Sequence, residues 1–264
     1  MLNWLRRKRR AELRRRPFPQ AWQSIIERNV PYVGRLTPQD MEELLGHVQV
    51  FLSEKRFEGC GGMTITDDVR VTIAAQACVL LLHREATYYP RLVSILVYPT
   101  TFLTPGGSVE GGLETDALEP ALGESWARDV LVLAWDSVLS GAADMHDGQN
   151  LVLHEFAHQL DQEDGVADGA PMLPRRSMYV AWARVLGDEY EQLVRETRLE
   201  QKSLMDHYGA TNPAEFFAVA TETFFEMPRQ LRSRHPKLYQ QLAEFYRQDP
   251  AATSTEGATP NSRG

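Results

Sequence analysis

The chain has 264 residues, of which 43% are hydrophobic and 24% charged, and its formal net charge is −8. This length supports one large domain with a sizeable core. No apolar run reaches the roughly 18 residues that a membrane-spanning helix needs. The basic start runs into Pro17, Phe18 and Pro19 instead of the apolar core of a secretory signal. Two cysteines, Cys60 and Cys78, lack metal-type spacing and indicate no disulfide framework. We therefore expect a cytoplasmic protein without a transmembrane segment.

Charge is distributed unevenly along the chain. Residues 1–16 hold eight Arg or Lys against one acid, Glu12, so this segment carries +7 and the remaining residues carry −15. The acidic main body argues against nucleic acid as a partner. Residues 1–19 are expected to form a basic, flexible N-terminal arm. This arm is either a solvated, partly helical end or a docking element for anionic lipid or an acidic partner.

Hydrophobic periodicity and the positions of Gly and Pro give the order of the elements. Apolar, branched segments predict strands over residues 92–98 and 129–135. Residues 104–123 and 162–176 have the composition of loops, and residues 250–264 have that of a disordered tail. Helices are predicted over residues 20–29, 38–56, 69–82, 178–200, 213–227 and 236–246, with a break over residues 58–62.

The segment His154–His158 reads HEFAH, which is an H-E-x-x-H motif. On a helix, positions four apart differ by about 40° in direction and by one turn in height, so both imidazoles project side by side. Two neutral imidazoles that converge in this way suit one Zn²⁺. Glu155 points about 60° to the side of His158 and is well placed to accept a proton from water that the metal activates. The alternative is a surface helix with accidental spacing.

The flanking residues favour a motif helix that is buried on one side. Four apolar residues cluster on the face opposite the histidines, namely Val152, Leu153, Phe156 and Leu160. Asp161 projects near His154 on the same stripe, where its carboxylate could accept a hydrogen bond from the imidazole and fix the tautomer. Asp161 is therefore a candidate for a residue that orients a ligand.

A catalytic zinc site normally has a third protein ligand and one position open to water. Asp164 stands ten residues after His154, where some zinc proteases place this ligand. That arrangement wants a Gly three residues after the second His, and this sequence has Asp161 there. Asp164 is therefore the weaker of two local candidates.

The stronger candidate lies in the predicted helix over residues 213–227. The surface of this helix is apolar except for one stripe of carboxylates, Glu215, Glu222 and Glu226. Carboxylates on a largely buried helix need partners, and a metal with its imidazoles is one. Glu215 also fits a capping-box position, with Asn212 as the N-cap and Pro213 as the first helical residue. Spacing alone leaves the choice between Glu215 and Glu222 open.

The motif at His154–His158, the sequence DHYG at residues 206–209 and the sequence NPAEFFA at residues 212–218 resemble the Mlc titration factor A family of zinc metallopeptidases. The resemblance covers nearly the whole chain, from Trp22 to about Pro250. More distantly, the sequence is similar to the catalytic domain of anthrax lethal factor. The N-terminal arm is more basic than the family pattern requires.

This resemblance implies roles for individual residues and a fold. In the family, a Glu seven residues after a catalytic Tyr completes the metal site, which makes Glu215 the third ligand, Tyr208 catalytic and Glu222 a supporting residue. The expected fold is α+β and zincin-like. A small mixed sheet would hold the two predicted strands, with the motif helix packed across it and additional helices at the N-terminus. Residues 20–249 would form a single catalytic domain.

The sequence thus predicts a zinc-dependent peptidase with His154, His158 and Glu215 as ligands. Glu155 would act as general base, and Tyr208 would stabilise the oxyanion. The resemblance further implies aminopeptidase activity on short peptide substrates. An alternative is a regulatory protein that captures a transcriptional repressor of sugar uptake, alone or in addition to peptidase activity. A zinc hydrolase that acts on a non-peptide bond is a third possibility.

Overall fold

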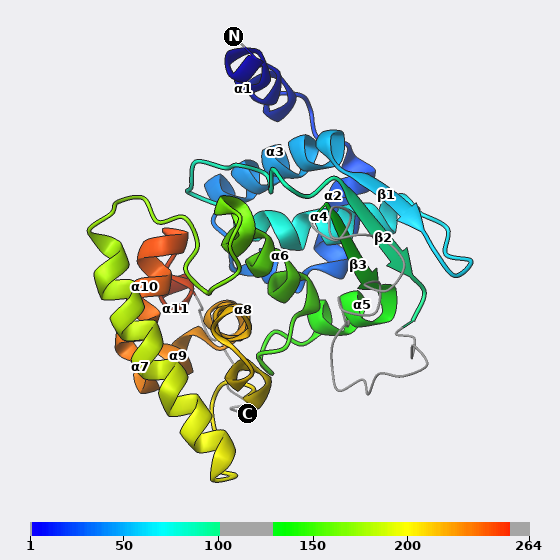
Figure 1. Ribbon diagram of the computed structural model, residues 1–264. Helices are drawn as coiled ribbons and strands as arrows, with labels where there is room; N and C mark the ends of the chain where they lie inside the picture. The colour runs from blue at the N-terminus through cyan, green and yellow to red at the C-terminus, as the bar shows by residue number, and fades with distance from the viewer. Residues whose placement is uncertain (1, 101–128, 254–264) are drawn as a thin grey trace, which may run out of the picture.

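The computed structural model describes residues 2–100 and 129–253, which form a helix-rich α+β structure (Figure 1). The strands are β1 (Arg56–Gly59), β2 (Ser94–Tyr98) and β3 (Val130–Ala134). Three 3₁₀ turns are η1 (Pro31–Arg35), η3 (Gln162–Asp164) and η4 (His207–Ala210). The α-helices are α1 (Leu2–Arg14), α2 (Gln20–Asn29), α3 (Pro38–Glu54), α4 (Asp67–Val79), α5 (Trp135–Ala143), α6 (Leu151–Asp161), α7 (Met178–Arg198), α8 (Pro213–Glu226), α9 (Pro228–Arg234), α10 (Pro236–Tyr246) and α11 (Pro250–Thr253).

Every helix predicted in the described residues is present, although some helices begin or end a few residues from their predicted bounds. Helix α3 begins at Pro38 with Thr37 as its N-cap, whose side chain accepts a hydrogen bond from the Asp40 N–H. It ends at Glu54, because β1 begins at Arg56. This four-residue strand was not predicted, since one apolar side chain gives no alternating pattern. The predicted loop over residues 104–123 lies outside the described residues.

The sheet has the order β1-β2-β3, and both neighbouring pairs are parallel. Ser94 on the central strand pairs with Arg56 of β1 and with Val130 of β3. The expectation of a mixed sheet is therefore wrong for the part of the chain that the structure describes. Parallel neighbours need a crossover connection, and α4 lies in the connection from β1 to β2.

The N-terminal segment, for which the sequence analysis expected a basic flexible arm or a partly helical end, is helical over Leu2–Arg14. It forms α1, which packs on α3. Leu13 is buried there, and Arg10 is only 8% exposed, with its Nε and Nη2 donating to the two carboxylate oxygens of Glu54. At the other end, α11 occupies the first residues of the predicted disordered tail, and residues 254–264 lie outside the described residues.

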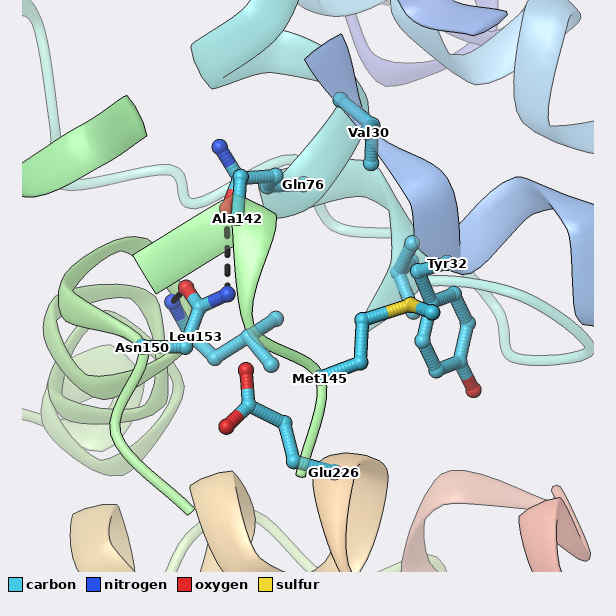
Figure 2. Close-up of a pocket in the computed structure, with 9 residues that line it drawn as sticks. Val30, Tyr32, Gln76, Ala142, Met145, Asn150, Leu153 and Glu226 are labelled. Carbon is cyan, nitrogen blue, oxygen red and sulfur yellow. Dashed lines mark hydrogen bonds between the residues drawn. The ribbon is translucent and has the colours of Figure 1, made fainter. Parts of the chain in front are cut away.

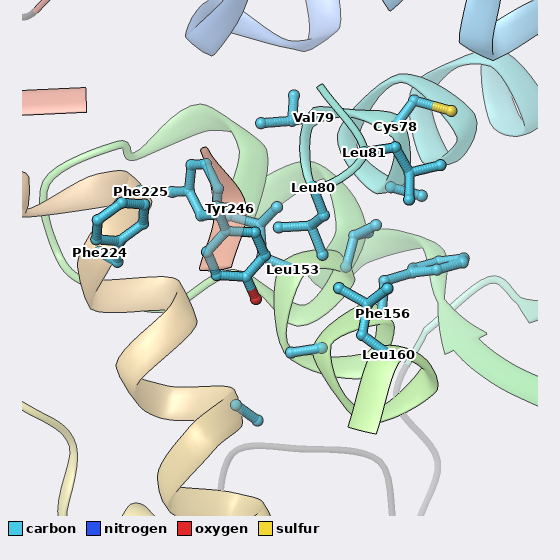
Figure 3. Packing of buried hydrophobic residues seen from close by; sticks show 14 of the residues in the cluster. Cys78, Val79, Leu80, Leu81, Leu153, Phe156, Leu160, Phe224, Phe225 and Tyr246 are labelled. Atoms are coloured by element: carbon cyan, nitrogen blue, oxygen red, sulfur yellow. The ribbon is translucent and has the colours of Figure 1, made fainter. Parts of the chain in front are cut away.

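Helix α6 lies between two groups of elements (Figure 1). One group holds the sheet with α2, α3, α4 and α5, and the other holds α7 and the helices that follow α8. Helix α6 contacts α4 and α5 on one side and α8 on the other. Figure 3 shows how its apolar side chains Leu153, Phe156 and Leu160 enter the core between these groups. In the described residues, no helix is long and apolar enough to cross a membrane.

Candidate metal centre

The start of α6 is fixed by Asn150. Its side-chain oxygen accepts a hydrogen bond from the Leu153 N–H at 3.0 Å, which caps the helix. Its amide nitrogen donates to Gln76 on α4 at 3.1 Å and to the Gly141 carbonyl on α5 at 3.2 Å (Figure 2). A Cβ on Gly141 would lie 3.1 Å from the Asn150 Cα, so the glycine permits this close approach. The position of the N-terminal end of α6 is therefore set by its contacts with α4 and α5.

The apolar face of α6 fixes the rotation of the helix. Phe156 is fully buried and lies against the rings of Phe51 and Tyr89, with ring centroids 5.6 Å and 4.7 Å away. The contact with Tyr89 is edge-to-face, and aromatic pairs of this kind add about 0.5–1.5 kcal/mol to the burial energy. The imidazoles of His154 and His158 consequently face α8.

Three donor atoms converge between α6 and α8. The Nε2 atoms of His154 and His158 lie 3.1 Å apart, and Glu215 Oε2 lies 3.0 Å from the first and 3.2 Å from the second. These residues form a group that could hold a metal ion. The structure thus places Glu215 beside both histidines.

The spacing and chemistry of these atoms fit a zinc ion. Ligand atoms about 2.0–2.2 Å from a tetrahedral Zn²⁺ lie roughly 3.3–3.6 Å from one another, close to the observed separations. Burial would lower the pKa of His154, but the carboxylates of Glu215 and Glu222 raise it well above its ordinary value. Burial would likewise raise the pKa of Glu215, but hydrogen bonds from His154 and His158 lower it to about 2. Glu215 is thus held as a carboxylate, and the negative charge of the two acids favours a cation beside the imidazoles.

Glu155, the candidate general base, is 6% exposed. Its burial raises the pKa of its carboxyl, although the positive charges of His154 and His158 act in the opposite direction. Glu155 therefore interacts electrostatically with both histidines of the cluster.

Glu222 supports His154 from α8. The imidazole donates from Nδ1 to Glu222 Oε1 at 2.7 Å, and the other carboxylate oxygen accepts from the backbone N–H of Asn150. A hydrogen bond to Nδ1 fixes the tautomer that leaves the Nε2 lone pair for a metal. Glu222 therefore makes the hydrogen bond that the sequence analysis also considered for Asp161.

Asp161 has a different role in the structure. It is fully buried, and its Oδ2 accepts a hydrogen bond from the Gly169 N–H at 2.9 Å. The Gly169 carbonyl in turn accepts from the indole of Trp182 on α7 at 2.9 Å. Burial raises the pKa of Asp161 to about 6. Asp161 anchors the loop after the motif helix, which the helical stripe alone did not reveal.

Asp164, the weaker candidate for the third ligand, lies in η3 with an exposed side chain. Its Oδ1 accepts a hydrogen bond from the Val166 N–H at 3.0 Å, so it shapes the turn that Gly165 closes in a left-handed conformation. Asp164 does not belong to the group formed by the two histidines and Glu215. Of these two candidates, Glu215 is the one whose carboxylate lies within the group formed with both histidines.

Tyr208 is placed by η4, which packs against α7 and α8. The Asp206 side chain accepts a hydrogen bond from the Tyr208 N–H at 2.8 Å and another from Gln149, just before α6, at 3.1 Å. The Tyr208 ring is 50% exposed, and its centroid lies 6.1 Å from that of His154. The aromatic ring therefore borders the histidine cluster and remains accessible to solvent.

Glu226, the third acid of the stripe on α8, lies beside a cavity of about 20 Å³ that Leu153 and Met145 also line (Figure 2). It is 3% exposed, and within the described residues its Oε2 has no hydrogen-bond partner. Burial, together with the nearby acids Asp147 and Glu222, raises the pKa of its carboxyl to about 9. The sequence analysis assigned no role to Glu226. The position of Glu226 in the stripe of acids on α8 predicted that it would be buried, but it could not reveal this separate cavity.

Two packed helices that bring two imidazoles and a carboxylate together beside a buried acid form the active-site arrangement of a metallopeptidase. Sequence comparison leads to the same class. The family model described as glucose-regulated metallo-peptidase M90 matches residues 2–247, and the chain belongs to this family.

Several relatives extend this assignment. The chain is 42% identical over 255 residues to the uncharacterized protein slr2042 of Synechocystis, covering 94% of this chain and 90% of that protein. It is 32% identical over 235 residues to the Mlc titration factor A of Serratia proteamaculans, covering 88% of each chain. It is 31% identical over 228 residues to the Mlc titration factor A of Yersinia pestis, covering 85% of this chain and 83% of that protein. The family resemblance seen in the motifs is thereby confirmed.

Proposed function

We propose that the protein is a zinc-dependent peptidase in which His154, His158 and Glu215 hold the metal. The observation that carries this proposal is the convergence of their three donor atoms within 3.2 Å of one another. The set of two imidazoles and one carboxylate is typical of catalytic zinc, which keeps a further position for water or substrate. The family implies that the peptidase uses a metal ion, and a donor set of two imidazoles and one carboxylate favours zinc as that ion.

Zn²⁺ held by these residues would supply Lewis acidity, which polarises a peptide carbonyl and makes water more acidic. Glu155 would accept a proton from the attacking water and then donate it to the leaving amine. Its burial and the electrostatic interaction of its carboxyl with His154 and His158 support this role. Glu222 would keep His154 in the tautomer that presents Nε2 to the metal.

Tyr208 is proposed as the donor to the oxyanion that develops when water attacks the carbonyl. Its ring borders that of His154, and η4 holds its backbone through Asp206. A phenol on a partly exposed loop can meet a substrate that enters from solvent. Aminopeptidase action on short peptides is the activity that the family resemblance favours, and we propose it as the first specificity to examine.

The decisive experiment compares the wild type with Glu155→Gln on a panel of fluorogenic aminoacyl and peptide substrates. We expect Glu155→Gln to bind zinc normally and to lose activity roughly 100-fold or more, since an amide cannot take the proton. A chelator should abolish wild-type activity, and added zinc should restore it. Glu163→Gln serves as a matched control, because Glu163 is a partly buried acid that bonds to Thr87 away from the cluster. Full activity of the Glu155→Gln protein would refute the general-base assignment.

A second function is favoured by the relatives that are named Mlc titration factor A. We propose that this chain also binds a transcriptional repressor of sugar uptake. Capture of a protein partner needs no turnover, so Glu155→Gln protein should retain the repressor in a pull-down as well as the wild type does. Failure of both proteins to retain a purified repressor of this class would remove the proposal and leave the peptidase assignment intact.

A further inference from the structure

Helix α1 projects from the body of the molecule (Figure 1). Among its side chains that the structure describes, the buried ones are Arg10 and Leu13, both in its C-terminal half. Arg10 donates to both carboxylate oxygens of Glu54 at 2.8 Å and 2.7 Å, and to the Thr87 carbonyl at 3.1 Å. Its guanidinium also lies 4.5 Å from the centre of the Tyr88 ring. Leu13 completes the anchor in the core. The first two turns of α1 are therefore held in a fixed direction while most of their side chains meet solvent.

The exposed part of α1 is strongly basic. Arg6, Arg7, Lys8 and Arg9 are all exposed, and Arg14 to Arg16 extend the basic surface. Arg7 pairs with Glu85 at 2.8 Å, but both side chains remain largely in solvent, so this pair is readily exchanged for another anion. Because residues 1–16 carry +7 and the rest of the chain −15, the helix is a local cationic surface on an acidic protein.

Two large apolar side chains lie at the outer end of this basic surface. Trp4 is 63% exposed and Leu5 is 54% exposed, and Lys8 lies 5.7 Å from the Trp4 ring. Exposed apolar side chains are common singly. An adjacent Trp and Leu at the end of a projecting cationic helix are a different case, because they combine an interfacial aromatic with clustered positive charge.

We propose that α1 is a docking element for an anionic membrane surface. Lys and Arg near such a surface are attracted by its negative potential, and Trp and Leu gain by entering the boundary between headgroups and acyl chains. A soluble polyanion would attract the basic side chains of α1 but would leave Trp4 and Leu5 in water. The acidic remainder of the chain is repelled by the same lipids, so docking orients the protein with α1 toward the bilayer.

The test uses the full-length protein and sedimentation with lipid vesicles. We expect binding to vesicles with about 30% phosphatidylglycerol to be at least about tenfold tighter than binding to pure phosphatidylcholine, and to disappear in about 0.5 M salt. The double variant Trp4→Ala/Leu5→Ala should weaken the binding about tenfold. Replacement of Arg6, Lys8 and Arg9 by Ala should abolish the preference for anionic lipid.

Matched controls separate this surface from general effects. Val180→Ala/Leu199→Ala removes two exposed apolar side chains, one from α7 and one from its C-cap residue, which are 79% and 66% exposed, and should leave binding unchanged. Zinc content and peptide hydrolysis in solution should be equal in all variants, which reports an intact fold. Equal binding to neutral and anionic vesicles would overturn the proposal. The proposal would also be overturned if the protein bound polyglutamate or duplex DNA as tightly as vesicles and the Trp4→Ala/Leu5→Ala change left that binding unaltered. A dimer in solution that dissociates in the Trp4→Ala/Leu5→Ala variant would overturn it as well.

Discussion

Glu222 holds His154 by a hydrogen bond of 2.7 Å from the imidazole Nδ1 to the carboxylate Oε1. The same carboxylate accepts a hydrogen bond from the Asn150 N–H, so one side chain of α8 fixes both the capping residue and the first histidine of α6. The opposite nitrogen of His154 faces Glu215. In the proposed metal site the two acids would therefore have different roles: Glu215 would offer an oxygen to the metal, and Glu222 would orient the imidazole that offers a nitrogen.

This division predicts different metal affinities for variants of the two acids. Glu215→Ala should remove a ligand and leave little zinc after dialysis. Glu222→Ala should weaken zinc binding by about 10–100-fold, as is typical when an outer partner of a ligating histidine is lost. The zinc affinity of Glu222→Gln should lie between those of Glu222→Ala and the wild type, because the glutamine amide oxygen can still accept a hydrogen bond from His154 Nδ1. Competition with a chromophoric chelator measures all three. Normal affinity in Glu215→Ala, with loss confined to the Glu222 variants, would show that the ligand was wrongly assigned.

The role proposed for Tyr208 leads to a second prediction. Tyr208→Phe should retain zinc and the position of η4, because the contacts of Asp206 are to the Tyr208 backbone and to Gln149. Loss of an oxyanion donor typically lowers kcat by roughly 100-fold or more. We expect a decrease of this size in kcat with little change in KM, measured by steady-state hydrolysis of a fluorogenic peptide. An unchanged kcat would assign oxyanion stabilisation to another group.

Gly169 lies against the start of α8, the helix that carries Glu215. Its φ is +76°, and a Cβ there would lie 2.4 Å from the carbonyl oxygen of Pro213, the first residue of α8. Gly169→Ala should therefore shift the start of α8, two residues before Glu215, and destabilise the fold by roughly 3 kcal/mol or more. Denaturant unfolding and zinc content measure the two effects.

Gly62→Ala is the matched control for this substitution. Gly62 also has a positive φ, +82°, but a Cβ there meets nothing within 4 Å. Only the left-handed backbone cost of about 1–2 kcal/mol should remain, with zinc content unchanged. If both variants were equally destabilised and kept their zinc, the contact with Pro213 would have no role in positioning the ligand.

Glu226 predicts a pH dependence of stability. Burial raises its pKa to about 9 in the folded protein, and the acids that face it are Asp147 and Glu222. Its ordinary value is 4.5, so between about pH 5 and pH 9 the unfolded chain has released a proton that the folded chain keeps. The contribution of Glu226 to stability is complete below the unfolded pKa and is lost as the pH rises toward 9.

Glu226→Gln imitates the neutral acid at every pH. Relative to wild type, this variant should gain up to about 1.4 kcal/mol in free energy of unfolding per pH unit across that window. Urea unfolding at pH 5, 7 and about 8.5 gives the comparison. A constant difference between the two proteins would mean that Glu226 is ionised in the folded state. Glu163→Gln tests whether any partly buried acid has the same effect.

Much of the centre was predictable from α6 alone. The 3.6-residue period places His154 and His158 on one face and Phe156 on the other, and the apolar surroundings of α8 identified an acid stripe for the third ligand. The choice between Glu215 and Glu222 was not available from spacing. It came from the family resemblance and agrees with the positions of their carboxylates.

Other features depend on tertiary packing and could not be read from one helix. Asp161 shares a stripe with His154, but seven residues of helix separate them by about 10.5 Å along the axis. The hydrogen-bond partner of His154 instead comes from α8, 68 residues away in sequence. The parallel sheet was missed for a related reason. Strand β1 is four residues long with largely exposed side chains, so only its pairing with β2 defines it.

Asn150 has a consequence for how the protein acquires its metal. It begins α6 and bonds to Gln76, Gly141 and Glu222, which belong to three other helices. These bonds fix the ligand positions through the protein's own architecture, whereas in zinc fingers the ion itself drives folding. Metal-free protein should consequently share its backbone with the loaded form, and the rate of zinc loading should be governed by access and by proton release from the imidazoles.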